Sequence, residues 1–165
     1  MMKVSNYIAL NNEANFGKPI ATQVSGGSHI TFEMITVSNG KFYMTRWPKG
    51  LPRHDDPPNT LRFPHGLIRF GESLEQCARR LVKDQLGMKV KSADIAYWDA
   101  HVDDKNHWHI EPGCIVQVAG KPRIPKGASE IVTFDVSNIP KMTFWPKEDF
   151  LEVVKDQLPE LFKKK

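Results

Sequence analysis

The stretch GLIRFGESLEQCARRLVKDQLGM, residues 66–88, decides the fold of this chain. Its apolar residues recur at intervals of three and four, which is the spacing of one face of an α-helix. Ser73 followed by Gln76 has the pattern of a capping box, and Gly87 suits the left-handed residue that ends a helix. We therefore predict a helix over residues 73–86 with one apolar side for the core.

Strand-like segments lie on both sides of this helix. Asn39 and Gly40 supply the positive φ angles of a tight turn, so the β-branched and aromatic segments that flank them form a predicted hairpin. The predicted strands are 30–37, 41–47, 61–63, 95–102, 107–119 and 130–136. A second helix should begin near Pro146, because proline suits the first helical position, and Pro159 should interrupt it. Strands with only two helices indicate the α+β class.

Composition and charge limit the classes of protein to be considered. The 165 residues are 40% hydrophobic and 25% charged, as in an ordinary single globular domain. The net charge is +4, but the last three residues are lysines, so we do not expect nucleic-acid binding. Cys77 and Cys114 fit a reducing compartment, and no run of about 18 apolar residues predicts a membrane span. We expect a cytoplasmic protein without a membrane partner.

Residues 66–88 resemble the Nudix box, G-x5-E-x7-R-E-U-x-E-E-x-G-U, in which U is a bulky apolar residue. The matched box positions are Gly66, Glu72, Arg80, Val82, Gly87 and Met88. The resemblance implies a Nudix-like α/β/α sandwich, with a mixed β-sheet between the box helix and the C-terminal helix. We expect a Nudix-like domain over residues 29–165 and an N-terminal extension over residues 1–28. Because dimers are common in the family, a homodimer is also an expectation.

The resemblance implies a metal site that this chain has partly lost. In the family, three glutamates of the box helix hold Mg²⁺ against the diphosphate of the substrate. Those positions are Leu81, Asp84 and Gln85 here, and their i, i+3, i+4 spacing puts them on one helix face. Because Mg²⁺ prefers charged oxygen ligands, the leucine and the amide degrade the site. The remaining metal ligands, for Mg²⁺ or Mn²⁺, are then Glu72, Asp84, Gln85 and His65.

Two further residues complete the catalytic group that the resemblance implies. Arg80 corresponds to a family arginine that pairs with acidic groups around the loop. Glu130 lies at the start of a late strand, where some family members place a catalytic glutamate. The predicted catalytic residues are therefore Glu72, Arg80, Asp84 and Glu130.

A second group of polar residues lies in the stretch DAHVDDKNHWHIE, residues 99–111. If residues 107–111 form an extended strand, the side chains of His107, His109 and Glu111 lie on one face of it. Two histidines and one carboxylate also bind the metal in non-haem iron proteins. The alternatives are a polar strand face that lines a cleft, two solvent-facing histidines, and a ligand-recognition surface. For recognition, the predicted substrate-binding residues are Arg46, Trp98, His107, Trp108 and His109, with the tryptophans stacking on a nucleobase.

Three functions follow from these patterns. The leading one is a divergent Nudix-type hydrolase, in which metal-activated water cleaves the diphosphate of a nucleoside diphosphate-linked substrate. The alternative is a catalytically inactive Nudix-fold domain that binds a nucleotide-like small molecule in a regulatory or scaffolding role. Leu81 favours this alternative, because an apolar side chain cannot become a metal ligand. A metal oxygenase that uses His107 and His109 is the third.

Overall fold

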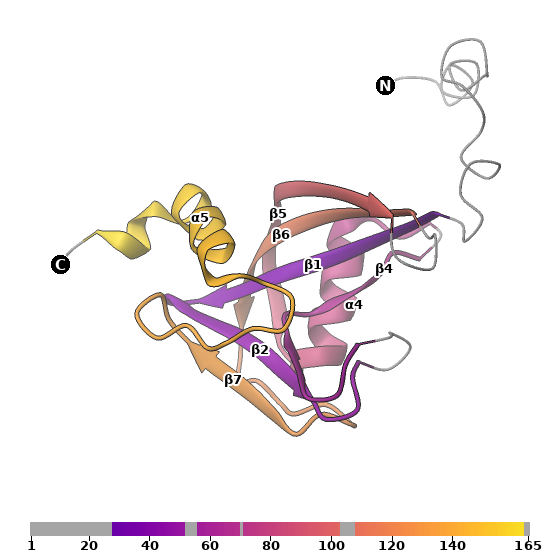
Figure 1. The fold of residues 1–165 in the computed structure, drawn as a ribbon, viewed down its shortest axis with the longest axis horizontal. Helices are drawn as coiled ribbons and strands as arrows, with labels where there is room; N and C mark the ends of the chain where they lie inside the picture. The colour runs from indigo at the N-terminus through magenta and orange to yellow at the C-terminus, as the bar shows by residue number, and fades with distance from the viewer. Residues whose placement is uncertain (1–27, 52–55, 70, 103–107, 164–165) are drawn as a thin grey trace, which may run out of the picture.

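A computed structural model describes residues 28–51, 56–69, 71–102 and 108–163 of the chain (Figure 1). The predicted extension lies outside these residues, apart from Ser28, and so do Phe70 and His107. The elements are β1 (Ser28–Ser38), β2 (Lys41–Trp47), β3 (Thr60–Arg62), β4 (His65–Leu67), α4 (Leu74–Leu86), β5 (Lys89–Val102), β6 (Trp108–Ala119), β7 (Glu130–Phe134), α5 (Lys147–Gln157) and the 3-10 helix η1 (Pro159–Phe162).

The strands form one mixed sheet between two helices. Its order is β3-β2-β1-β6-β5, with β4 also paired to β1 and β7 to β2. β1 and β6 run parallel, and all other strand pairs are antiparallel. Figure 1 shows α4 and α5 apart, on either side of the sheet. The predicted α/β/α sandwich is therefore confirmed.

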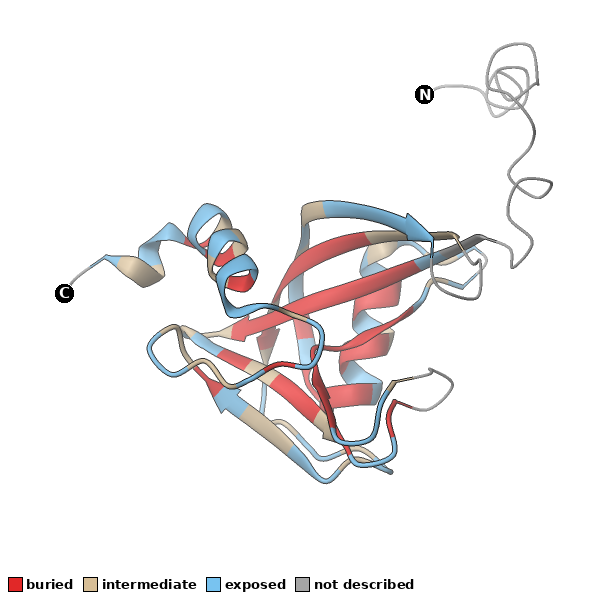
Figure 2. Cartoon of the chain, viewed as in Figure 1, coloured by how far each residue is buried: buried red, intermediate tan, exposed pale blue. Residues whose placement is uncertain are grey.

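Alternation along the central strands builds a core on each face of the sheet. Met34 packs in the cluster that contains the apolar side of α4, whereas its neighbour Ile35 packs in the cluster that contains α5. Cys114 and Ile115 divide between the two clusters in the same way. Figure 2 shows the buried residues running along β1, β2 and β6. Burial of both faces explains the nearly continuous apolar sequence of these strands.

The box helix begins and ends where its local signals predict. The Ser73 side chain accepts a hydrogen bond from the backbone nitrogen of Gln76 at 3.2 Å, and the Gln76 side chain accepts one from the backbone nitrogen of Ser73 at 2.8 Å. Gly87 adopts the left-handed conformation, with φ of 67°. Because these contacts are local, sequence alone was sufficient to place this helix.

The other elements differ from the prediction mainly at their ends. β5 begins at Lys89 instead of residue 95, because its polar first half is held at the sheet edge by pairing with β6. β4 was not predicted, and it forms through its pairing with β1. α5 begins directly after Pro146, near the predicted start, and ends at Gln157, before the predicted interruption at Pro159; the 3-10 helix η1 was not predicted. Within the described residues, no helix has the length and apolar character needed to cross a bilayer.

Candidate functional site

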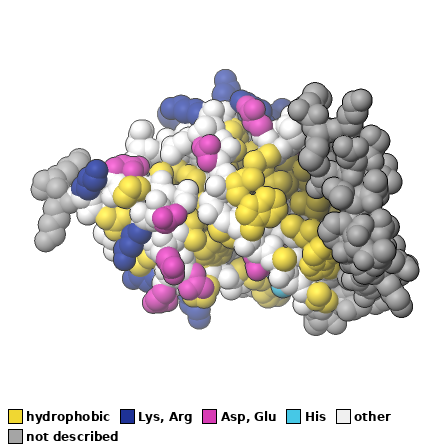
Figure 3. Space-filling model, turned by 90° about the horizontal axis from the view of Figure 1, so that it is seen from above, with side chains coloured by type: hydrophobic (Ala, Val, Ile, Leu, Met, Phe, Trp, Pro, Cys, Tyr) yellow, Lys and Arg dark blue, Asp and Glu magenta, His cyan; other side chains and the backbone are white. Residues whose placement is uncertain are grey.

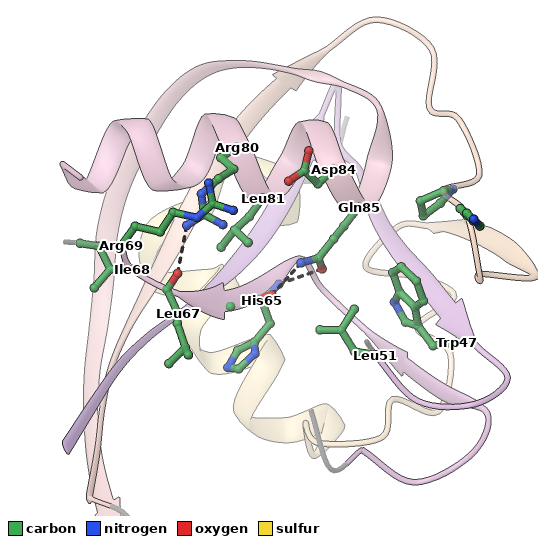
Figure 4. Close-up of a pocket in the computed structure, with 13 residues that line it drawn as sticks. Trp47, Leu51, His65, Leu67, Ile68, Arg69, Arg80, Leu81, Asp84 and Gln85 are labelled. Carbon is green, nitrogen blue, oxygen red and sulfur yellow. Dashed lines mark hydrogen bonds between the residues drawn. The ribbon is translucent and has the colours of Figure 1, made fainter. Parts of the chain in front are cut away.

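The box helix and β4 border a cleft of about 660 Å³, which we call the box cleft (Figure 4). The β4 residues that line it are His65, Gly66 and Leu67. The α4 residues that line it are Arg80, Leu81, Asp84 and Gln85. The helix and the short strand therefore bring three of the predicted metal ligands, His65, Asp84 and Gln85, to one cleft, whereas Glu72 does not line it.

The side chain of Gln85 is bonded at both ends to the backbone of β4. Its Nε2 donates to the carbonyl oxygen of His65 at 2.7 Å, and its Oε1 accepts from the nitrogen of His65 at 3.1 Å. The dashed lines in Figure 4 mark these two bonds. Two predicted metal ligands, Gln85 and His65, are thus bonded to each other through the Gln85 amide and the His65 backbone.

Leu81 packs against the backbone of Gly66. Its side chain is only 5% exposed, and a Cβ atom placed on Gly66 would lie 2.8 Å from its Cδ2. Leucine offers no oxygen to a cation. The position that carries a glutamate in the family is therefore filled by a close apolar contact.

Glu72 and Arg80 form a bidentate ion pair near the start of α4. Arg80 Nε lies 2.7 Å from Glu72 Oε1, and its NH2 nitrogen lies 2.6 Å from Oε2. The backbone nitrogen of Arg69 also donates to Oε2, at 2.9 Å. These contacts, that with Arg80 first, lower the pKa of Glu72 to about 2. Arg80 also donates to the carbonyl of Leu67, so the predicted structural role of this arginine matches its contacts.

The residues of the box cleft do not fit a bound Mg²⁺. Of the predicted ligands, Gln85 and His65 bond to each other, and Glu72 is bound by Arg80. Asp84 is exposed and lines the cleft, but a single carboxylate is far from the several oxygen ligands that Mg²⁺ requires. Of the predicted metal set, only Asp84 thus offers the box cleft a carboxylate, while Gln85, the His65 backbone and Glu72 are bonded to other groups.

The structure does not bring Glu130 to the box cleft. This residue pairs with Arg46 across β7 and β2, with Glu130 Oε1 2.5 Å from Arg46 Nε. Neither residue lines the box cleft. The predicted catalytic glutamate and the predicted substrate-binding arginine therefore contact each other.

The predicted recognition residues lie on different faces of the β5–β6 pair. Trp98 is 65% exposed, and it follows Tyr97, which points into a second cleft on the α5 face. His109 lines that second cleft. Its neighbour Trp108 lies on the opposite face of the sheet, because successive residues of a strand alternate between the two faces. Figure 3 shows hydrophobic side chains gathered on the surface seen from above. The tryptophans and His109 therefore do not form one ligand surface.

We call the second cleft, with a volume of about 720 Å³, the hairpin cleft. It lies between the ends of β5 and β6 and the segment that leads into α5. Its polar and aromatic lining consists of Glu33, Asp56, Arg62, His65, Tyr97, Asp99, His101, His109, Glu111, Phe144, Trp145 and Asp149. Three of these residues, His65, His109 and Glu111, were candidates predicted from the sequence, and Asp99 and His101 lie in the polar stretch 99–111 that was singled out there. A signal for Glu33 was present, since it is the single charged residue in the strand ITFEMITV.

Two carboxylates in the hairpin cleft have opposite pKa shifts. Glu33 is 6% exposed and accepts a hydrogen bond from Trp145 Nε1 at 2.7 Å. Burial raises its pKa to about 7, although the positive charge of Arg62 opposes the shift. Burial also acts to raise the pKa of Glu111, but hydrogen bonds from His65 and Thr31 lower it to about 2. At neutral pH one carboxylate is ionised and the other is close to its midpoint.

Comparison with known proteins adds a distant sequence relative. No family model matches the chain. An ADP-ribose pyrophosphatase of Methanocaldococcus jannaschii is 28% identical over 97 residues, which make up 58% of this chain and 55% of the relative. The chain thus matches about half the length of that curated relative.

Solved structures give the stronger likeness. The MutT protein of Methanosarcina mazei Go1 superposes with a TM-score of 0.63 over 80% of this chain and 96% of that chain, at 14% identity. A MutT NUDIX hydrolase of Burkholderia pseudomallei gives 0.61 over 79% and 98%, at 15% identity. The chain is a Nudix-fold protein, and the resemblance predicted from the box is confirmed in the fold.

Proposed function

We propose that this protein binds a nucleoside diphosphate-linked ligand on a Nudix scaffold whose box helix no longer holds a catalytic Mg²⁺. The observation that carries the proposal is the replacement of oxygen ligands at the box. Leu81 packs on Gly66, and the Gln85 amide bonds with the backbone of His65. Loss of charged ligands from a phosphate-bound metal forfeits several kcal/mol of charge stabilisation. At about 1.4 kcal/mol per tenfold in rate, that loss slows hydrolysis by several orders of magnitude.

The charges of the box cleft support an anionic ligand. Arg69 and Lys126 are exposed cations in its lining. Asp84 is the one carboxylate among the described residues that line it. Arginine and lysine bind phosphate oxygens directly, without a metal between them. A diphosphate therefore suits this cleft better than a hydrated cation does.

Hydrolysis is the second candidate, and specific observations favour it. The Glu72–Arg80 pair is formed and Asp84 remains accessible. The M. jannaschii relative is named an ADP-ribose pyrophosphatase. In this reading Asp84 and the phosphates of the substrate supply the oxygens that hold the ion.

Binding and hydrolysis of ADP-ribose separate the two candidates. Binding would be followed by calorimetry in EDTA, and release of AMP would be followed with Mg²⁺ or Mn²⁺. We expect binding without turnover, and about tenfold weaker binding for the Arg69→Ala/Lys126→Ala variant. Lys91→Ala removes an exposed lysine that does not line the box cleft, and it should leave the affinity unchanged.

Two outcomes would contradict the proposal. Metal-dependent release of AMP that disappears in Asp84→Asn would identify a hydrolase. Equal affinity of the double variant and the wild type would show that the ligand does not bind at the cations of the box cleft. A panel of sugar nucleotides and dinucleotides, run in the same way, would then define the ligand class.

A further inference from the structure

The β5–β6 pair places four metal-ligating side chains at the hairpin cleft. Asp99 lies directly opposite Glu111 in the antiparallel register, and His101 lies directly opposite His109. All four residues line the hairpin cleft, so they share one face of the sheet. Two imidazoles and two carboxylates therefore meet at its mouth.

The distances among three members of this group suit one ion. One ligand atom each from Asp99, His101 and Glu111 lies within 4.8 Å of the other two. The rings of His101 and His109 are nearly parallel, with centroids 5.2 Å apart and an angle of 9°. Ligand atoms around a tetrahedral Zn²⁺ are separated by roughly 3.4 Å, given bonds of about 2.1 Å. Because Asp99 and His101 are exposed, small rotations of their side chains close this difference.

Contacts behind the group hold its most buried member in place. Glu111 Oε1 lies 2.6 Å from His65 Nε2 and accepts from Thr31 Oγ1 at 3.1 Å. Both contacts end on Oε1. His101 Nδ1 lies 3.0 Å from Asp99 Oδ2, so these two side chains are already in contact at the mouth of the cleft.

A further carboxyl group, that of Glu33, lies buried in the wall of the same cleft. Glu33 also lines it and is more than nine-tenths buried. Its Oε1 has no hydrogen-bond partner among the residues that the structure describes, although Oε2 is bound by Trp145. A buried oxygen left without a donor is unfavourable, and a cation nearby would offset part of that cost.

We propose that Asp99, His101 and Glu111 form a binding site for a divalent transition metal, with His109 beside them as a fourth candidate ligand and Zn²⁺ as the probe. Imidazole and carboxylate together suit Zn²⁺, Co²⁺ or Ni²⁺, whereas Mg²⁺ prefers oxygen alone. The site does not depend on the function proposed for the box cleft. It also differs from the triad predicted from sequence, because partners on the neighbouring strand take the place of His107.

Calorimetric titration of the full-length chain with Zn²⁺, together with absorption spectra of the Co²⁺ form, tests this site. We expect one equivalent to bind, and His101→Ala/Glu111→Gln to lower the affinity by about 100-fold. Asp149→Asn is the matched control, since this exposed residue lines the same cleft outside the group. Thermal unfolding in EDTA would verify that each variant is folded.

Three results would overturn the proposal. One is the absence of Zn²⁺ binding by the folded wild type. Another is unchanged affinity in the folded His101→Ala/Glu111→Gln variant. The third is loss of binding in His107→Ala together with full binding in His101→Ala, which would place the metal at the sequence-predicted triad.

Discussion

The side chain of Gln85 and the backbone of His65 exchange two hydrogen bonds, and this pair joins the box helix to β4. His65 was a predicted metal ligand, and here its backbone carbonyl accepts from an amide nitrogen at 2.7 Å. A neutral amide thus makes the connection between helix and strand. A glutamate at position 85 could accept from the nitrogen of His65, but it could not donate to the carbonyl.

Gln85→Glu should therefore destabilise the protein in EDTA. One bond is lost and a carboxylate oxygen is placed against a carbonyl oxygen, so we expect a loss of about 1–3 kcal/mol. Urea unfolding at neutral pH measures it, and the exposed neighbour Asp84→Asn should change stability by less than about 0.5 kcal/mol. Full recovery of stability on addition of Mg²⁺ would contradict our conclusion that the box cleft does not fit this ion.

Gly66→Ala tests the contact between β4 and the box helix. The new methyl group would meet the side chain of Leu81 at 2.8 Å, so the buried leucine must shift. We expect a cost of about 1–3 kcal/mol in the free energy of unfolding. Leu81→Ala should then cost less in the Gly66→Ala background than in the wild type, because it removes the clash. Strict additivity in this double-mutant cycle would show that the two residues are not in contact.

Glu33 should make stability fall as pH rises. Its pKa is about 7 in the folded protein and near 4.5 when unfolded, so the folded state retains the proton between these values. The stabilisation is complete below pH 4.5 and is lost as pH rises through 7. Glu33→Gln keeps an acceptor for Trp145 and removes this dependence, so the variant should gain stability relative to wild type between pH 5 and 8. Urea unfolding at several pH values measures this difference, and exposed Glu75→Gln should show no such gain.

The ion pair of Glu72 and Arg80 should make stability fall as the pH is lowered. The pKa of Glu72 is lowered to about 2, so its contribution is present above pH 4.5 and is lost as pH falls toward 2. Glu72→Gln should be less stable than wild type at pH 7, and the difference should shrink as the solution is acidified. Arg80→Lys should also be less stable, because lysine cannot make both bonds. Equal stability of Glu72→Gln and wild type at pH 7 would contradict this role.

The elements that could be predicted from sequence are those whose signals are local. The ends of α4 follow from Ser73, Gln76 and Gly87, which lie within a few residues of the turns that they stabilise. β4 escaped prediction because Pro64-His65-Gly66 has the composition of a turn and its strand geometry comes from β1. Gln85 was interpreted as a weakened metal ligand, since its bonds to a residue 20 positions away are visible only in three dimensions.

The hairpin cleft shows a different limit. Trp108 and His109 are adjacent, so an extended strand must place them on opposite faces, and this much the sequence already implied. The partnership of Asp99 and His101 with β6 was not predictable in the same way. Irregularities between Val90 and Ser92 and between Ile95 and Tyr97 shift the register of β5, and thereby decide which of its residues face the cleft.

The parallel pairing of β1 with β6 has a kinetic consequence. Thr31 and Glu111 come together across this pair although they are 80 positions apart in the chain. The central strands can therefore join only after a long loop has closed, and that loop includes the whole of α4 and β5. Contacts between distant segments slow folding, so we expect this domain to fold in milliseconds to seconds, well behind helical bundles of its size. During synthesis, β1 cannot form its parallel pairing with β6 until β6 has left the ribosome.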